Sequence, residues 1–207
     1  TSLREVIYDI GGGCPNGKKF KAVQTGGPSG GCITADYIDT KIDFDTLTAL
    51  GSMMGSGGMI VMDEDNCMVD IARFFLEFTV EESCGKCTPC RIGLGQLTKL
   101  IESILLGNGS VESLNLIEET AKSILDTADC AIGYEAAKIA LVSVKNFRTE
   151  YLAHINEQQC YYGVRHAIPC TAVCPAHVDV PGYIALVKAG NYNDAVRLIR
   201  KDNPFPS

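Results

Sequence analysis

What the 207-residue sequence lacks excludes several classes of protein. No apolar run approaches the ~20 residues that a membrane-spanning helix needs, so we expect no direct membrane insertion. Basic residues are in deficit, with 18 Lys and Arg against 25 Asp and Glu and a net charge of −7. Phosphate backbones repel such a chain, so nucleic acid is not an expected partner. No Ser/His/Asp arrangement or carboxylate pair stands out, which leaves hydrolase chemistry without support.

Cysteine is the residue that is abundant, with ten in the chain. The segment 1–5 has neither the basic start nor the apolar core of a signal peptide, so we expect a cytoplasmic location. Disulfides are disfavoured in that reducing compartment, and clustered cysteines there usually bind metal. A disulfide scaffold remains an alternative that would require export.

The first third of the chain is predicted to be a small α+β unit. Residues 19–24 alternate like a strand, and residues 58–62 form a short apolar run typical of a buried strand. Residues 43–50 predict a short helix that ends at Gly51. The glycine-rich stretch 26–31 lacks the spacing of a phosphate-binding loop and predicts a tight turn.

The rest of the chain is predicted to be helical. Apolar residues recur at the helical period, and short connections between helices favour antiparallel packing in a bundle. Prolines interrupt the pattern after Cys160, and two short helices follow them. The expected helices span about 66–80, with Asp65 or Asn66 as the cap, then 92–106, 111–127 with Ser110 as the cap, 134–155, 182–189 and 192–201.

Cys84, Cys87 and Cys90 form a Cys-x2-Cys-x2-Cys run. Three thiolates at this spacing suit three irons of one [4Fe–4S] cluster, whereas zinc sites usually use separated Cys-x2-Cys pairs. The alternative is a set of buried free thiols. The neighbouring Lys86 and Arg91 would raise the cluster potential if they lie close to it, or are ordinary solvated cations.

A fourth ligand has to come from elsewhere, and Cys130 is the candidate. It follows Cys90 after 39 residues, which is enough for one helical hairpin. The first helix of such a hairpin leads away from Cys90 for roughly 22 Å, and the second returns over a similar distance. Cys130 is therefore expected beside the Cys84–Cys90 loop.

A second cysteine group, Cys160, Cys170 and Cys174, leaves three interpretations open. Cys-x3-Cys-Pro at 170–175 is typical of the closing half of an iron–sulfur run, so Cys170 and Cys174 are candidates for a second metal site. Together with His166 and His177 they would instead form an adventitious zinc site. Free thiols are the third interpretation.

Three further cysteines, Cys14, Cys32 and Cys67, are isolated in the sequence and are interpreted as small core residues or surface thiols. His154 lies near a predicted helix end and is interpreted as a partner of the helix dipole rather than as a ligand.

Three segments resemble a known family: residues 26–32 (GGPSGGC), 82–91 (ESCGKCTPCR) and 147–155 (FRTEYLAHI). In this order they resemble the C-terminal half of the NADH-binding flavoprotein subunit of complex I and of NAD(P)-linked hydrogenases and formate dehydrogenases. The resemblance implies a β-grasp domain of the SLBB (soluble-ligand-binding) type, then a helical bundle with one 4Fe-4S cluster. The family's four ligands fall on Cys84, Cys87, Cys90 and Cys130, the last within 129–133 (DCAIG).

Residues from about 157 onward resemble another family. Residues 169–184 (PCTAVCPAHVDVPGYI) and 203–206 (NPFP) are similar to the iron–sulfur domain of the glutamate synthase small subunit and of dihydropyrimidine dehydrogenase. That family has a Cys-x2-Cys pair upstream, where this sequence has only Cys160. The sequence therefore does not predict a complete second cluster.

Together these inferences give an α+β protein with three parts: an SLBB-like β-grasp domain (1–63), a helical 4Fe-4S domain (64–156) and the start of a second helical iron–sulfur domain (157–207). The expected function is single-electron relay in an NAD(P)H-oxidising enzyme, with other subunits or domains of a redox complex as partners. FMN and NAD(P)H would bind a domain before Thr1, so this chain alone should not turn over. The alternative is a zinc-stabilised module that binds a ligand or a partner.

Overall fold

A computed structural model describes residues 1–27, 30–157, 160 and 178–203. The chain divides into two compact units, Thr1–Gly163 and Val164–Ser207. Cys170 and Cys174, the candidates for a second metal site, lie outside the described residues. Within the part of the chain that is described, no helix combines the length and the apolar character needed to cross a membrane.

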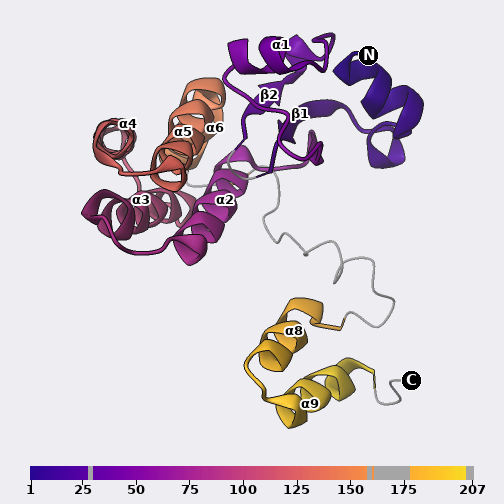
Figure 1. Ribbon diagram of the computed structural model, residues 1–207, viewed down its shortest axis with the longest axis vertical. Coiled ribbons are helices and arrows are strands. Elements are labelled where there is room, and N and C mark those ends of the chain that lie inside the picture. Colours follow the sequence, from indigo (N-terminus) through magenta and orange to yellow (C-terminus); the bar gives the residue numbers. More distant parts are fainter. Residues whose placement is uncertain (28–29, 158–159, 161–177, 204–207) are drawn as a thin grey trace. The chain divides into compact units, whose positions relative to one another are not determined.

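The first unit starts with a three-stranded antiparallel sheet in the order β2-β1-β3 (Figure 1). We call residues 1–63 the sheet region. Two of its strands and its α-helix confirm the predicted elements within one or two residues. Its elements are η1 (Glu5–Ile10), η2 (Pro15–Gly17), β1 (Phe20–Thr25), β2 (Cys32–Thr34), η3 (Ala35–Tyr37), α1 (Phe44–Ala49) and β3 (Met59–Asp63).

The core of the sheet region lies around the central strand. Val23 of β1 is fully buried, together with Leu3 and Ile7 from the N-terminal segment and Leu47 of α1. The carboxylate of Asp43 accepts a hydrogen bond from the Thr46 N–H at 2.8 Å and so caps α1. This core is small and is assembled from short elements.

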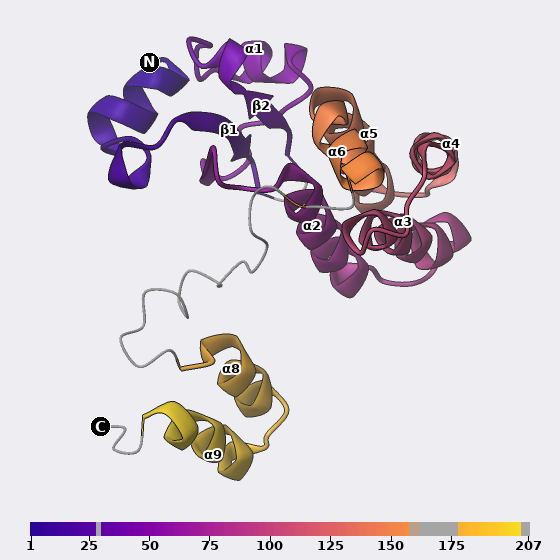
Figure 2. The same ribbon diagram turned by 180° about the vertical axis from the view of Figure 1, so that it is seen from behind.

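We call residues 68–157 the helical region; its helices lie beside the sheet in both views (Figures 1 and 2). Its residues form one large apolar cluster that includes Leu76, Leu97 and Tyr151, each fully buried. The helical region and the sheet region together confirm the α+β class. Its helices are α2 (Met68–Glu82), η4 (Pro89–Leu94), α3 (Gly95–Leu105), α4 (Val111–Thr127), α5 (Ala131–Asn146) and α6 (Arg148–Glu157).

Two of the predicted helices need correction. The helix expected at 66–80 begins at Met68, because the Asn66 side chain accepts from the Asp63 N–H at 2.7 Å and holds a turn instead of a helix cap. The single helix expected at 134–155 is two helices, because the chain leaves the helical conformation at Phe147 (φ −123°, ψ 28°). The helix at 111–127 is confirmed, with Ser110 and Ser113 forming a reciprocal cap.

A third apolar cluster joins the two regions: Ala22 and Met62 of the sheet pack with Met68 of α2 and Phe147. Glu150 of α6 reinforces this junction. Its carboxylate pairs with the Lys21 ammonium at 2.6 Å and accepts the Met68 N–H at 3.0 Å. The start of α2 is therefore tied both to β1 and to α6.

The second unit contains two helices in its described part, α8 (Val180–Lys188) and α9 (Tyr192–Asp202). Asp179 caps α8 by accepting the Gly182 N–H at 3.0 Å. The helices pack closely at Gly182, where a Cβ atom would lie 2.8 Å from the Leu198 side chain. Both helices confirm the predictions for this segment.

Candidate metal centre

The cysteine triple lies on the loop between α2 and η4 and at the start of η4. Cys84 is exposed, Cys87 is half-buried and Cys90 is buried. Gly85 adopts φ +68°, a conformation that favours glycine, and its carbonyl accepts a hydrogen bond from the Arg91 guanidinium at 3.2 Å. Pro89 occupies the first turn of η4, where a missing N–H is tolerated. Gly85, Arg91 and Pro89 thus set the backbone conformation of the loop that carries the three thiols.

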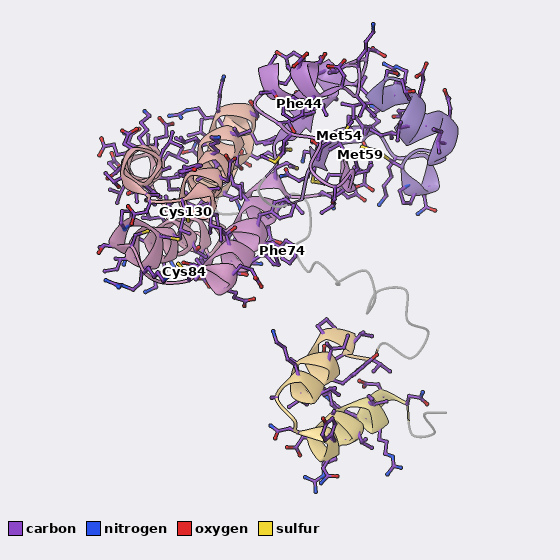
Figure 3. The ribbon with its side chains drawn as sticks, viewed as in Figure 1. Phe44, Met54, Met59, Phe74, Cys84 and Cys130 are labelled. Atoms are coloured by element: carbon purple, nitrogen blue, oxygen red, sulfur yellow. The ribbon has the colours of Figure 1, made fainter. Side chains whose placement is uncertain are left out.

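Cys130 comes to this loop from the other end of a helical hairpin. It lies between the end of α4 and the first residue of α5, as the N-cap of α5. The backbone of its neighbour Asp129 lowers the pKa of the Cys87 thiol, which indicates that the two segments lie near each other. In Figure 3, Cys84 and Cys130 lie at the same end of the helical region.

The pKa of the Cys90 thiol depends on all three of the other cysteines. Burial is the main cause that raises its pKa, and charge on Cys87, Cys130 and Cys84 raises it further. The Ser83 hydroxyl, 3.0 Å from the Cys90 sulfur, acts in the opposite direction. The thiolate forms of the four cysteines repel one another. A bound cluster of metal ions would offset this repulsion, because it binds the cysteines as thiolates.

The Cys87 thiol has the opposite electrostatic environment. The backbone of Asp129 and of Cys90 lowers the pKa of this thiol, and this effect outweighs its partial burial. Hydrogen bonds of this kind stabilise a thiolate and also tune the potential of an iron–sulfur cluster. The lowered pKa makes Cys87, the middle cysteine of the triple, the easier thiol to ionise for metal binding.

Helix packing behind the site depends on Gly133, in the first turn of α5. A Cβ atom at this position would lie 2.4 Å from the Ala128 Cβ and 3.9 Å from the Cys90 Cβ. Glycine thus lets the start of α5 approach the end of α4 and the cysteine loop closely. This approach brings the Cys130 segment beside the triple.

The donor set fits a [4Fe–4S] cluster. All four cysteines are free thiols, and no other side chain is needed to complete four ligands. In such a cluster each thiolate binds a different iron, so the sulfurs surround the metal group without contacting one another. Lys86 is exposed on the same loop, while Arg91 is held against it.

A second group of potential ligands lies elsewhere in the first unit, and the sequence interpretation missed it. The Cys67 sulfur is 3.2 Å from His154 Nε2, and the Cys160 sulfur completes a group whose ligand atoms all lie within 4.8 Å of one another. Cys67 is thus not isolated, and His154 is a buried neighbour of two thiols in addition to lying in the last turn of α6.

Comparison with known proteins gives two family matches. Residues 70–154 match the NADH-ubiquinone oxidoreductase-F iron–sulfur binding region, and residues 138–207 match the 4Fe-4S cluster domain II of dihydropyrimidine dehydrogenase. Residues 70–154 are therefore similar to the first of these families, which we call the F-type iron–sulfur family. Both matches confirm the resemblances recognised in the sequence, and the F-type region contains the four cysteines of the candidate site.

Curated relatives extend this match. The chain is 49% identical over 178 residues to the NADP-reducing hydrogenase subunit HndC of Solidesulfovibrio fructosivorans, covering 86% of this chain and 35% of that protein. It is 43% identical to an F-type NADH-quinone oxidoreductase subunit of Rhizobium meliloti, covering 77% of this chain and 38% of that protein. The chain thus spans little more than a third of the length of these relatives.

A solved structure has a fold similar to that of this chain. The crystal structure of an NAD+-reducing [NiFe]-hydrogenase in the H2-reduced state superposes with a TM-score of 0.65 at 26% identity. The match covers 75% of this chain and 26% of the hydrogenase chain. These relatives are subunits of oxidoreductases, which agrees with an electron-transfer role for the F-type region.

Proposed function

We propose that this chain is the electron-relay part of an NAD(P)H-oxidising oxidoreductase and that Cys84, Cys87, Cys90 and Cys130 hold one [4Fe–4S] cluster. The observation that carries the proposal is the close approach of the two cysteine segments: a Cβ atom at Gly133, three residues after Cys130, would lie 3.9 Å from the Cys90 Cβ. The charge of the other three thiols, which raises the pKa of the Cys90 thiol, agrees with this approach. When bound, such a cluster accepts and releases one electron at a time.

The protein's own groups would set the properties of this site. Backbone N–H donors at Cys87 offset the negative charge of the thiolates, and the start of α5 directs the positive end of its dipole toward Cys130. Arg91, bound to the loop carbonyl of Gly85, adds a fixed positive charge nearby. All three features favour the reduced form of the centre.

The complete enzyme is part of the same proposal. FMN and NAD(P)H would bind a domain outside this chain, consistent with relatives named for NADH-quinone and NADP-reducing activities. The electron would pass to other subunits or domains, and the location would be cytoplasmic. The chain by itself would bind the cluster and show no dehydrogenase turnover.

The three-domain division belongs to this proposal too. Residues 1–63 would form an SLBB-like β-grasp domain and residues 64–156 a cluster-binding bundle, with a second iron–sulfur domain starting at 157. Separate apolar clusters in the sheet region and the helical region support the first boundary.

Anaerobic reconstitution of the full chain with iron and sulfide tests the ligand set. We expect about four iron and about four sulfide per chain, a brown colour, and an electron paramagnetic resonance signal after reduction. Cys130→Ser should lose this signal while the chain keeps its helical circular dichroism. If wild-type protein took up only zinc and stayed colourless, the zinc-stabilised module would replace the electron relay as the function.

A further inference from the structure

Ser83 is the last residue before the cysteine triple and forms the C-cap of α2. Its side chain is half-buried, and its hydroxyl oxygen lies 3.0 Å from the Cys90 sulfur, seven residues further along the chain. The Gly85 N–H donates to the same hydroxyl oxygen at 3.2 Å. One hydroxyl group therefore connects the end of α2, the turn of the loop and the buried cysteine of the triple.

The direction of the hydrogen bond between Ser83 and Cys90 follows from metal binding. In the free thiol either group can donate. A cysteine that binds iron does so as a thiolate, which has no proton and can only accept. The Ser83 oxygen accepts from the Gly85 N–H through a lone pair, so its own O–H can still donate. With a metal bound, the Ser83 hydroxyl is therefore the donor and the Cys90 sulfur the acceptor.

Cys90 is the proposed ligand at which a fixed donor has the largest effect. Its side chain is 5% exposed, whereas Cys84 and Cys130 are exposed and Cys87 is half-buried. Water can solvate the exposed sulfurs but has little access to the Cys90 sulfur. A hydrogen bond is electrostatically stronger in such a water-poor environment than in water.

We propose that Ser83 is a positioning residue of the four-cysteine centre, whose hydroxyl raises the reduction potential of a cluster bound there by donating to the Cys90 sulfur. This inference rests on the proposed electron-relay function. Reduction adds one negative charge to the cluster and its thiolates, so a donor at a ligand sulfur stabilises the reduced form more than the oxidised form. The O–H bond stays intact, and only the one-electron equilibrium changes.

Ser83 also supports the loop, and the test has to separate this role from the effect on the potential. The hydroxyl oxygen holds the N–H of Gly85, which adopts φ +68° and whose carbonyl accepts from the Arg91 guanidinium. Ser83→Ala removes both hydrogen bonds of the hydroxyl, whereas Ser83→Thr keeps a hydroxyl for both. A purely structural role would change the retention of iron but not the potential of the clusters that remain bound.

A redox titration of the reconstituted full chain tests the inference. Wild type and variants are loaded anaerobically with iron and sulfide, and the electron paramagnetic resonance signal of the reduced cluster is followed against the potential. We expect Ser83→Ala to make reduction about tenfold less favourable, which is about 59 mV for a one-electron couple. Ser83→Thr should restore most of the wild-type potential, because it keeps the donor.

Thr88→Val is the matched control. Thr88 belongs to the same loop, but its side chain is exposed and makes no capping hydrogen bond to η4. The substitution removes a hydroxyl group close to the cysteines while it leaves the Ser83 hydroxyl in place. The potential of Thr88→Val should therefore equal that of wild type.

Isotope exchange provides a second measurement that a purely structural role of Ser83 would not affect. Resonance Raman bands of the iron–thiolate stretches should shift between H₂O and D₂O in wild type, because an exchangeable O–H donates to a ligand sulfur. The shift should be smaller in Ser83→Ala and return in Ser83→Thr.

The outcomes separate this inference from the function on which it rests. If wild type bound about four iron and Ser83→Ala kept the wild-type potential, the role of Ser83 would be refuted and the electron relay would stand. If Ser83→Ala retained no iron, wild type would decide, and iron–thiolate bands that do not respond to D₂O would overturn the inference. Wild type that bound no iron would refute the electron relay and this inference together.

Discussion

The sheet region and the helical region both contain buried cysteines, but they place them differently. Cys14 packs in the small apolar core of the sheet region, and among the described residues no other ligand group converges on it. In the helical region, the loop after α2 and the start of α5 bring Cys84, Cys87, Cys90 and Cys130 to one place. We propose that the approach of separate chain segments, rather than burial alone, suits a thiol to act as a ligand.

The largest expected effect separates Cys87 from Cys14. Cys87→Ser should abolish stable cluster binding, because a serine hydroxyl stays protonated near neutral pH and is a poor ligand for iron. Cys14→Ser should reconstitute like wild type, since this thiol lies in the other core. Visible absorbance and iron content after anaerobic reconstitution measure both. Equal iron in Cys87→Ser and wild type would refute the ligand assignment.

The junction between the regions should respond strongly to Glu150→Ala. This change removes the ion pair with Lys21 and the acceptor of the Met68 N–H, both of which are largely shielded from water. We expect a loss of about 2–3 kcal/mol in the free energy of unfolding, measured with urea. Asp39→Ala, which breaks the exposed pair with Arg4, is the control and should change the free energy of unfolding far less, because solvent screens this pair. Similar losses in the two variants would mean that the junction contributes little.

Close packing behind the four-cysteine site predicts a smaller effect at Gly133. Gly133→Ala should destabilise the protein by about 1–2 kcal/mol, because the new methyl would collide with Ala128. Gly95→Ala in α3 is the control, since nothing lies within 4 Å of a Cβ there, and it should be neutral or stabilising by about 0.5–1 kcal/mol. Thermal unfolding of both variants measures the difference, and the opposite order would show that the approach of α5 to α4 is not tight.

The smallest effect is expected at the cap of α1 in the sheet region. Hydrogen bonds from the Thr46 hydroxyl and from the Thr46 N–H lower the pKa of the half-buried Asp43 carboxyl below 3.8. Its stabilising contribution is therefore present above about pH 4 and is lost as the pH falls through the lower pKa of the folded state. Asp43→Ala should lower the urea midpoint slightly at pH 7, and the difference from wild type should shrink at pH 3. A constant difference would assign the effect to something other than the charged cap.

The sequence predicted the local elements well where local chemistry determines them. Ser110 caps the start of α4, and the alternation of residues 19–24 predicts β1. The break at Phe147 was not predicted, because Phe147 lies on the apolar face and the helical period continues through it. The π-helical turn at Glu5–Ile10 carries no pattern that distinguishes it from a loop.

Of the two candidate sites, the sequence predicted the four-cysteine site but not the Cys67–His154–Cys160 group. A Cys-x2-Cys-x2-Cys run is visible in any sequence, and a hairpin of suitable length indicates Cys130. Cys67 and His154 are 87 residues apart, without a repeated spacing, so only the fold brings them together. Tertiary packing, rather than sequence pattern, creates that second group.

The break at Phe147 also sets the order in which the protein can fold. It redirects α6 so that Glu150 and His154 reach positions near Met68 and Cys67, which lie 82 and 87 residues earlier in the chain. The entropy of closing such long loops is lost before these contacts return any free energy, whereas α4 and α5 pair across a few residues. We therefore expect the contacts of α6 with the start of α2 to form after the local pairing of α4 with α5.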